Sequence, residues 1–172
     1  MKPNAIRPIA ICVFQHNGRI LAAEGYDPLK QQLFYRPLGG AIEFGEYSAD
    51  TLVRELQEEL GAAVTDLLYL GTLENVFTFN GQTGHEIVMV YDGAFVDRGL
   101  YERPWLDGAE DDGAPFRAVW LSLAEGRRPA APPVYPTGLL ELLEQELTQR
   151  RKGAKALRSK VFLAPLLLSA FA

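Results

Sequence analysis

The sequence predicts an α+β protein in which a mixed β-sheet lies between helices. Three observations support this fold class: strand-like segments precede and follow one helical segment, a second helical segment comes after them, and no repeat of fixed period occurs. The composition, with 48% hydrophobic and 23% charged residues, is that of a globular protein and excludes a disordered, collagen-like or coiled-coil chain. A length of 172 residues suits one domain, at most with an appendage.

Two strands joined in a hairpin are the first predicted elements. Apolar residues alternate with smaller ones over residues 7–13, and a second apolar run follows at 20–22. Asn17-Gly18 lies between these runs and is the strongest short hairpin signal. A third, short strand is predicted at 33–37.

A helix is predicted over residues 48–60. Ser48 suits its N-cap position, and Gly61 suits the left-handed residue that ends a helix. The apolar residues of this segment occupy one arc and are expected to face the core: Leu52, Val53, Leu56 and Leu60.

The second half of the chain is predicted to contain a hairpin, a last strand and a helix. β-branched and aromatic residues dominate 67–79 and 85–96, which a loop of five residues separates. Residues 97–115 are predicted to be irregular, and residues 116–123 to form a strand. A helix is predicted to begin at Thr137, after a proline-rich spacer.

Charge is distributed unevenly along the chain. The net charge is −5, but six of the 17 Lys and Arg residues lie within 150–160, and all 22 Asp and Glu residues lie within 1–149. An acidic body repels a nucleic-acid backbone at long range, so duplex nucleic acid is not an expected partner. Anionic small molecules are compatible with it, since a bound divalent cation inverts the local sign of charge.

Cys12 is the single cysteine, which excludes an internal disulfide framework and a cysteine-based zinc site. The N-terminal residues lack the apolar run and the cleavage site of a signal peptide. These observations lead us to expect a cytoplasmic protein.

The chain is predicted to divide into a domain of residues 1–149 and a tail of residues 150–172 that is basic and then apolar. The last twelve residues, 161–172, are nearly all apolar but too short to span a bilayer, which needs about 20 residues. We expect the tail to pack on its own domain or against a second copy in a homodimer, and to supply no catalytic residue. Attachment to a membrane surface is the less favoured alternative.

Three glutamates, Glu55, Glu58 and Glu59, fall within one arc of the predicted helix, because positions i, i+3 and i+4 are neighbours. Carboxylates gathered beside a buried face repel one another, and the only cation within this helix is Arg54. A hard divalent cation that prefers oxygen ligands, such as Mg²⁺, is the natural compensation.

The residues before this helix extend the pattern. Gly39-Gly40 permits backbone conformations in which a carbonyl turns toward a bound ion. Gly45 allows a second sharp turn, after which Glu46 is free to meet Arg54 and hold the loop against the helix. Each feature alone is common, and it is their combined spacing that indicates a site.

In this spacing the sequence resembles the Nudix box, the signature of hydrolases that act on nucleoside diphosphates linked to another moiety. Gly40 is followed after five residues by Glu46, and after seven more by residues 54–62, which read Arg-Glu-Leu-Gln-Glu-Glu-Leu-Gly-Ala. Every polar and glycine position of the pattern is present, and Ala62 replaces a usually bulkier aliphatic residue. The resemblance implies the α/β/α sandwich of that family over about residues 5–148.

The resemblance also implies metal ligands. Glu55 and Glu59 would be the main ligands of Mg²⁺, with Mn²⁺ as an alternative ion. Glu58 would be a further ligand or a partner of metal-bound water, and Gly39 would offer its carbonyl oxygen to a metal.

Other box residues would support the site rather than bind metal. Gly40 opens the box, and Arg54 and Glu46 would orient the glutamates through an ion pair. The reaction would be attack of a metal-activated water on a diphosphate phosphorus.

Many members of the family use a further acidic ligand or base from outside the box. The candidates in this sequence are Glu86, Glu110, Asp111 and Asp112. The sequence favours none of them, and a box glutamate can serve instead, so the general base stays unassigned.

Aromatic residues on predicted strands near the box are candidates for binding the rest of the substrate: Phe34, Tyr35, Phe77, Phe79 and Tyr91. Most of them are expected to belong to the core, and stacking of one or two on a base is the alternative. Arg36 either pairs with a phosphate or caps the sheet edge.

The sequence therefore predicts a Mg²⁺-dependent pyrophosphohydrolase that acts on a nucleotide-type small molecule. A Nudix-fold module that binds or senses a nucleotide without turnover is the main alternative, and the intact glutamates argue against it. An isomerase on a related fold would need a catalytic Cys–Glu pair, whereas Cys12 lies in an apolar strand and is expected to be a buried, inert thiol.

Overall fold

A computed structural model describes residues 5–110 and 112–162 of the chain. The chain forms two compact units, Met1–Leu140 and Glu141–Ala172, which are described separately. The elements, in chain order, are β1 (Ile6–His16), β2 (Arg19–Asp27), β3 (Gln32–Arg36), α1 (Ser48–Leu60), β4 (Val64–Phe79), β5 (Gln82–Phe95), the 3₁₀ helix η1 (Arg98–Glu102), β6 (Trp105–Ala109), β7 (Pro115–Ser122), α2 (Leu123–Gly126) and α3 (Leu139–Phe162).

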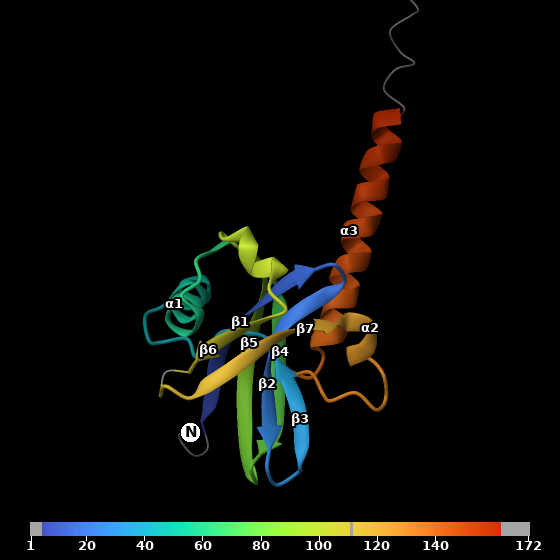
Figure 1. The fold of residues 1–172 in the computed structure, drawn as a ribbon. Helices are drawn as coiled ribbons and strands as arrows, with labels where there is room; N and C mark the ends of the chain where they lie inside the picture. The colour runs from blue at the N-terminus through green and yellow to red at the C-terminus, as the bar shows by residue number, and fades with distance from the viewer. Residues whose placement is uncertain (1–4, 111, 163–172) are drawn as a thin grey trace, which may run out of the picture. The chain divides into compact units, whose positions relative to one another are not determined.

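The strands form one mixed sheet (Figure 1). Their order is β4-β5-β1-β2-β7-β6, and β3 pairs with β2 beside this path. β1 and β5 run parallel, whereas the other neighbours are antiparallel. The predicted α+β class with a mixed sheet is confirmed.

Helices cover both faces of this sheet, with α1 on one side and α2 on the other (Figure 1). Leu52 and Leu56 of α1 pack in one buried cluster with Ala10, Cys12 and Phe14 of β1. The intervening β1 residues are buried on the opposite face, because a central strand with both faces covered is apolar throughout. This arrangement is the predicted sandwich.

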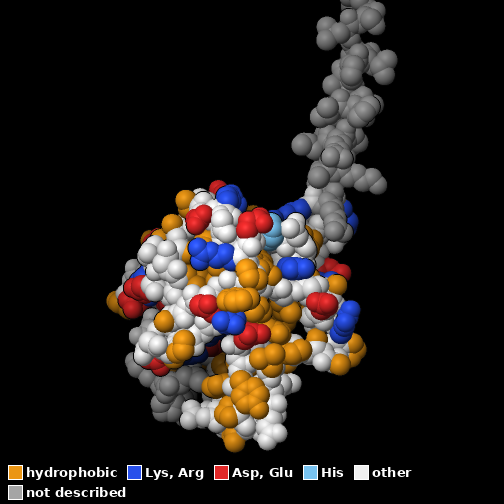
Figure 2. Space-filling model, viewed as in Figure 1, with side chains coloured by type: hydrophobic (Ala, Val, Ile, Leu, Met, Phe, Trp, Pro, Cys, Tyr) orange, Lys and Arg blue, Asp and Glu red, His pale blue; other side chains and the backbone are white. Residues whose placement is uncertain are grey.

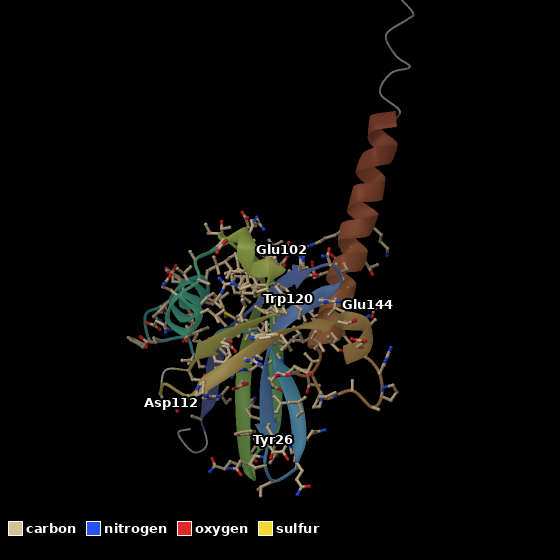
Figure 3. The ribbon with its side chains drawn as sticks, in the orientation of Figure 1. Tyr26, Glu102, Asp112, Trp120 and Glu144 are labelled. Carbon is tan, nitrogen blue, oxygen red and sulfur yellow. The ribbon has the colours of Figure 1, made fainter. Side chains whose placement is uncertain are left out.

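β1 and β2 meet at one end and then diverge. Asn17 and Gly18 form the turn with positive φ angles of 49° and 73°, as the hairpin signal predicted. The ladder between the two strands holds only the pairs Gln15–Ile20 and His16–Arg19. Figure 3 marks the two ends of β2, with Trp120 of the neighbouring strand near the paired end and Tyr26 at the far end. Beyond these two pairs the sheet divides into two halves, β4-β5-β1 and β3-β2-β7-β6.

The segment after β3 takes the place beside β1 that β2 leaves. Leu38 bridges to Cys12, and Ala41 bridges to Ile9, so the segment runs antiparallel to β1 over the part that β2 leaves unpaired. The sequence signal for this path is Gly39-Gly40, which breaks the strand and lets the chain cross toward α1.

Three local predictions are wrong in detail. Ser48 does not cap α1, because its hydroxyl contacts the Tyr91 hydroxyl at 2.6 Å and Tyr47 occupies the N-cap position. The second hairpin closes at Asn80-Gly81 rather than through a five-residue loop, since both residues adopt positive φ. The segment 97–115, predicted to be irregular, contains η1 and the edge strand β6, which pairs with β7.

The second unit is described by its helix. α3 begins at Leu139, two residues after the predicted start, and continues without interruption across residues 149 and 150. Among the described residues, no helix is both long and apolar enough to cross a membrane. The apolar end of the predicted tail, residues 163–172, lies outside the described residues.

Candidate active site

α1 carries the predicted glutamates, and the structure separates them by burial. Glu55 and Glu59 are buried, with exposed fractions of 4% and 7%, whereas the Glu58 side chain is 52% exposed. The spacing explains this difference, because positions i and i+4 share the inward face while i+3 lies toward its border. Two adjacent buried carboxylates are costly unless a cation or hydrogen-bond donors face them.

Arg54 is the cation that faces these glutamates. Its Nη1 lies 3.0 Å from Glu55 Oε1 and 3.1 Å from Glu58 Oε2. Its Nε and Nη2 donate to the two oxygens of Glu46, each at 3.0 Å. The predicted Arg54–Glu46 ion pair is therefore present, and the same guanidinium also contacts two glutamates of the box.

Glu46 is held as a carboxylate by several donors. The Arg54 guanidinium, followed by the Thr51 hydroxyl at 2.8 Å, lowers the pKa of Glu46 to about 2. The backbone N–H of Glu43 also donates to it, at 3.2 Å. The same pairing raises the pKa of Arg54 above its usual value. The loop that contains Glu46 is thus tied to α1 by charge-assisted hydrogen bonds.

Gly40 lies directly against the Glu55 carboxylate. A Cβ at Gly40 would collide with both carboxylate oxygens, so only glycine fits without displacing Glu55. Gly39 has a φ of 133°, and a Cβ there would collide with the Ala10 carbonyl. β1 takes the carbonyls on either side of Gly39, because Cys12 N–H donates to Leu38 and Ala10 N–H donates to Gly40. Both glycines are therefore required for close packing between the loop, β1 and α1.

The donors of this site fit a hard divalent cation in kind but are not gathered around one point. Carboxylate and backbone carbonyl oxygens are the ligands that Mg²⁺ prefers. Among residues 5–110 and 112–162, however, no group of three or more His, Cys, Asp or Glu side chains is arranged to hold a metal ion. Glu55 faces Gly40 and Arg54 instead.

The acidic candidates from outside the box lie in different places. Glu86 of β5 is buried and bonded to Arg7 and Asn75, and Glu110 lies 3.8 Å from Arg36. Asp112 accepts a hydrogen bond from the Ala114 N–H of its own turn. Asp111 falls outside the described residues.

A cavity of about 340 Å³ is lined by residues from both halves of the sheet. Its lining includes three of the aromatic candidates, Phe34, Phe77 and Phe79, together with Arg36. The two remaining aromatic candidates, Tyr35 and Tyr91, are not among its lining residues; Tyr91 packs against the core cluster instead.

Sequence reasoning missed the two polar residues that meet Glu86 in this cavity, Arg7 and Asn75. Both stand within strands that are otherwise largely apolar, and a polar residue in such a strand is a signal for a buried hydrogen-bond cluster. Their partner Glu86 lies opposite each of them in the two ladders of β5.

Cys12 belongs neither to the site around the box glutamates nor to the lining of the cavity. It is fully buried in the core cluster, and burial raises the pKa of its thiol. A thiol in this state is a poor nucleophile, which agrees with the expected inert role and not with an isomerase.

The fold and the box define a class of protein, and comparison with known proteins identifies it. The model of the NUDIX domain family matches residues 5–139, and the chain belongs to this family. The matched range contains the box of residues 40–62 and the strands around it.

Similarity to individual proteins is more distant. The NAD-capped RNA hydrolase NudC of Mycobacterium tuberculosis is 27% identical over 124 residues, which are 71% of this chain and 39% of that protein. The chain thus spans about two fifths of the length of this curated relative.

Two solved structures share the fold. A MutT NUDIX hydrolase from Burkholderia pseudomallei superposes with a TM-score of 0.56 at 20% identity, covering 80% of this chain and 96% of that one. A NUDIX hydrolase from Nitrosomonas europaea gives a TM-score of 0.57 at 19% identity, with coverage of 84% and 90%. These likenesses establish the α/β/α sandwich.

Proposed function

We propose that the protein is a Mg²⁺-dependent pyrophosphohydrolase that cleaves the diphosphate linkage of a nucleoside diphosphate joined to another moiety. The observation that carries this proposal is the pair of buried carboxylates, Glu55 and Glu59, on one face of α1. Arg54 is the one basic residue of α1, and two of its three guanidinium nitrogens donate hydrogen bonds to Glu46. A divalent cation would find two carboxylate ligands on this face, and oxygen ligands are those that Mg²⁺ prefers.

Each residue of the box has a role in this proposal. Glu55 and Glu59 would hold the ion, Mg²⁺ or Mn²⁺, with Glu58 as a further ligand or a partner of bound water and Gly39 as a carbonyl donor. The bound ion would lower the pKa of a water molecule and offset the charge that develops on the leaving phosphate.

The remaining residues would position the loop and the substrate and would not contact the reacting atoms. Arg54 and Glu46 would fix the loop that carries Gly39 and Gly40 against α1. Arg36, which directly precedes this loop segment, would be available to a phosphate, because its ion pair with Glu110 is long at 3.8 Å and both side chains are partly exposed. The general base is not assigned.

The name of the distant relative NudC supports a nucleotide-type substrate, since that protein is described as acting on NAD-capped RNA. A diphosphate joins the two halves of such a cap, and the same linkage occurs in nucleotide sugars and ADP-ribose. We therefore propose the linkage and not a particular compound.

The test is a screen of diphosphate-containing nucleotides with Mg²⁺, in which the masses of the products identify the bond that breaks. The panel holds nucleoside triphosphates, nucleotide sugars, ADP-ribose, NAD and dinucleoside polyphosphates. We expect at least one compound to yield two phosphate-bearing products or a released pyrophosphate, and excess EDTA to stop the reaction. Binding of a compound without any cleavage in Mg²⁺ or Mn²⁺ would instead establish a non-catalytic nucleotide-binding module.

Three further expectations from the sequence stay predictions. They are a domain boundary near residue 149, a cytoplasmic location and a homodimer.

A further inference from the structure

The cavity has flat aromatic walls that the backbone holds in place. Phe34 lies opposite Gly25 in the β2–β3 ladder, and Phe77 lies opposite Gly84 in the β4–β5 ladder. A Cβ at either glycine would collide with the partner ring, so each ring lies across the neighbouring strand where a side chain would otherwise stand. The two rings come from opposite halves of the sheet, and both line the cavity.

The edges of other rings complete this wall. Phe34 meets Phe79 and Tyr135 in edge-to-face contacts, with ring centroids 5.9 Å and 5.7 Å apart. In the view of Figure 2, hydrophobic side chains gather over the lower parts of β2 and β3, the strands that supply Gly25 and Phe34. Walls of this kind bind planar rings, because stacked and edge-to-face arrangements both place ring against ring.

A polar cluster stands among these apolar walls. The Glu86 carboxylate is buried and accepts hydrogen bonds from Arg7 Nη2 and from Asn75 Nδ2. Asn75 is fixed in turn by the Thr137 N–H, which donates to its Oδ1 at 3.4 Å. A carboxylate has about four lone-pair positions, so Glu86 retains capacity to accept further bonds from a ligand.

Arg7 provides the complementary donor. Its Nε is buried and is the one such side-chain nitrogen or oxygen without a hydrogen-bond partner among the residues that the structure describes. Buried polar atoms are nearly always bonded, so an unpaired donor in a cavity wall indicates an acceptor that arrives with a ligand. Arg7 and Glu86 together present one donor beside one acceptor.

The lining of the cavity carries four acidic and three basic residues. Its basic residues each face an acid of the lining, in the pairs Arg7–Glu86, Lys30–Asp27 and Arg36–Glu110. Glu24 adds a fourth acid to the lining. An uncharged ring is therefore favoured over an anionic group.

We propose that this cavity binds an uncharged heteroaromatic ring with an exocyclic amino group, and that Glu86 and Arg7 determine specificity for it. Glu86 accepts a hydrogen bond from the amino group, and Arg7 Nε donates to the neighbouring ring nitrogen or carbonyl oxygen. An aminated nucleobase presents this edge, whereas a nucleobase with a carbonyl oxygen or a hydrogen in place of the amino group does not. The inference rests on the proposed function for placing the ring within a diphosphate substrate.

The test is calorimetric titration of the full chain with mononucleotides in EDTA, so that the box glutamates bind no metal. Two pairs test the amino group: AMP against purine riboside 5′-monophosphate, and CMP against UMP. In at least one pair the aminated member should bind about tenfold or more tightly, as expected for a charge-assisted hydrogen bond. Lack of discrimination in both pairs, or no binding, would overturn the proposal.

Two variants test whether the preference for the aminated mononucleotide arises in this cavity. Glu86→Gln should reduce the discrimination about tenfold, whereas Glu74→Gln, an exposed carboxylate on the neighbouring strand, should retain it. Gly84→Ala should push the Phe77 ring into the cavity and weaken both members of each pair together. If Glu86→Gln does not fold, Gly84→Ala decides the matter: wild-type affinity in that variant would refute the site. Hydrolysis is not part of this readout, so its absence would count against the proposed function alone.

Discussion

Arg54 and Glu46 are joined by two parallel hydrogen bonds, from Nε to Oε1 and from Nη2 to Oε2, each 3.0 Å long. Both side chains are largely shielded from solvent, with exposed fractions of 26% and 17%. Such a two-point contact fixes the direction of the guanidinium as well as its charge. Its third nitrogen then faces Glu55 and Glu58, so the loop before α1 determines how the box glutamates are held.

The first prediction concerns the coupling of this pair. Arg54→Ala and Glu46→Ala should each lower stability and activity, and the double variant should lose less than the sum, because one interaction is removed by either change. A coupling energy of about 0.5–3 kcal/mol is expected from a double-mutant cycle of urea unfolding. Additive losses would contradict the contact.

Arg54→Lys is the matched control for this cycle. Lysine keeps the charge but lacks the planar fork, so it cannot satisfy both oxygens of Glu46 in the same way. We expect Arg54→Lys to recover only part of the loss in the alanine variant. Full recovery would mean that charge alone matters at this position.

The second prediction concerns acid stability. The folded protein lowers the pKa of Glu46 from its usual value near 4.5 to about 2, so Glu46 stabilises the fold above pH 4.5 and loses this contribution as the pH falls toward 2. The free energy of unfolding of wild type should therefore fall more steeply between pH 4.5 and 2 than that of Glu46→Gln. Parallel curves in this window would show that Glu46 is not held as a carboxylate.

Sequence-local features of the site were predictable, and features that depend on strand register were not. The box spacing predicts the Arg54–Glu46 pair and the shared arc of the glutamates, because both lie within one loop and one helix. The contact of Gly40 with Glu55 needs the loop to cross β1, which no local pattern specifies. Ser48 failed as a cap for the same reason, because its partner Tyr91 is distant in sequence.

In the cavity, too, some residues were predictable from the local sequence and others depended on strand order. Its aromatic residues were candidates because aromatic side chains are conspicuous in predicted strands. Arg7 and Asn75 escaped notice because they meet Glu86 only through the order β4-β5-β1, which places the first strand beside a hairpin from the middle of the chain. A charged residue in an apolar strand was the available signal.

The third prediction concerns the metal. Glu59→Gln should keep the fold and lose at least about 10²-fold in turnover, because it removes one charge from the proposed ligand set with little change in shape. Glu43→Gln, an exposed glutamate of the preceding loop, is the control and should keep wild-type activity. The rates are measured with Mg²⁺ and with excess EDTA. Wild-type turnover in Glu59→Gln, or full activity in EDTA, would exclude the metal mechanism.

The fourth prediction concerns residues 150–172, which carry six cations and an apolar end. A chain that ends at Gln149 should retain metal-dependent hydrolysis but lose thermal stability or change its oligomeric state in light scattering, since an apolar segment is expected to be buried. If the shortened chain is unchanged in both respects and only the full chain binds anionic vesicles, the membrane alternative replaces burial.

The last prediction concerns Gly40, whose Cα faces the Glu55 carboxylate. Gly40→Ala introduces a methyl group that collides with the carboxylate oxygens, although the backbone of Gly40 does not require glycine, since its φ lies outside the left-handed region. We expect at least about a tenfold loss of activity with a destabilisation of about 1–3 kcal/mol, typical of one added methyl group in a packed site. Gly126→Ala is the matched control, because a Cβ there makes only ordinary contacts beyond 3.5 Å. Turnover and thermal melting of both variants decide the matter. If Gly40→Ala is destabilised but as active as Gly126→Ala, the Glu55 carboxylate can move without cost to the reaction, and its present contact with the loop is not the arrangement that catalysis uses.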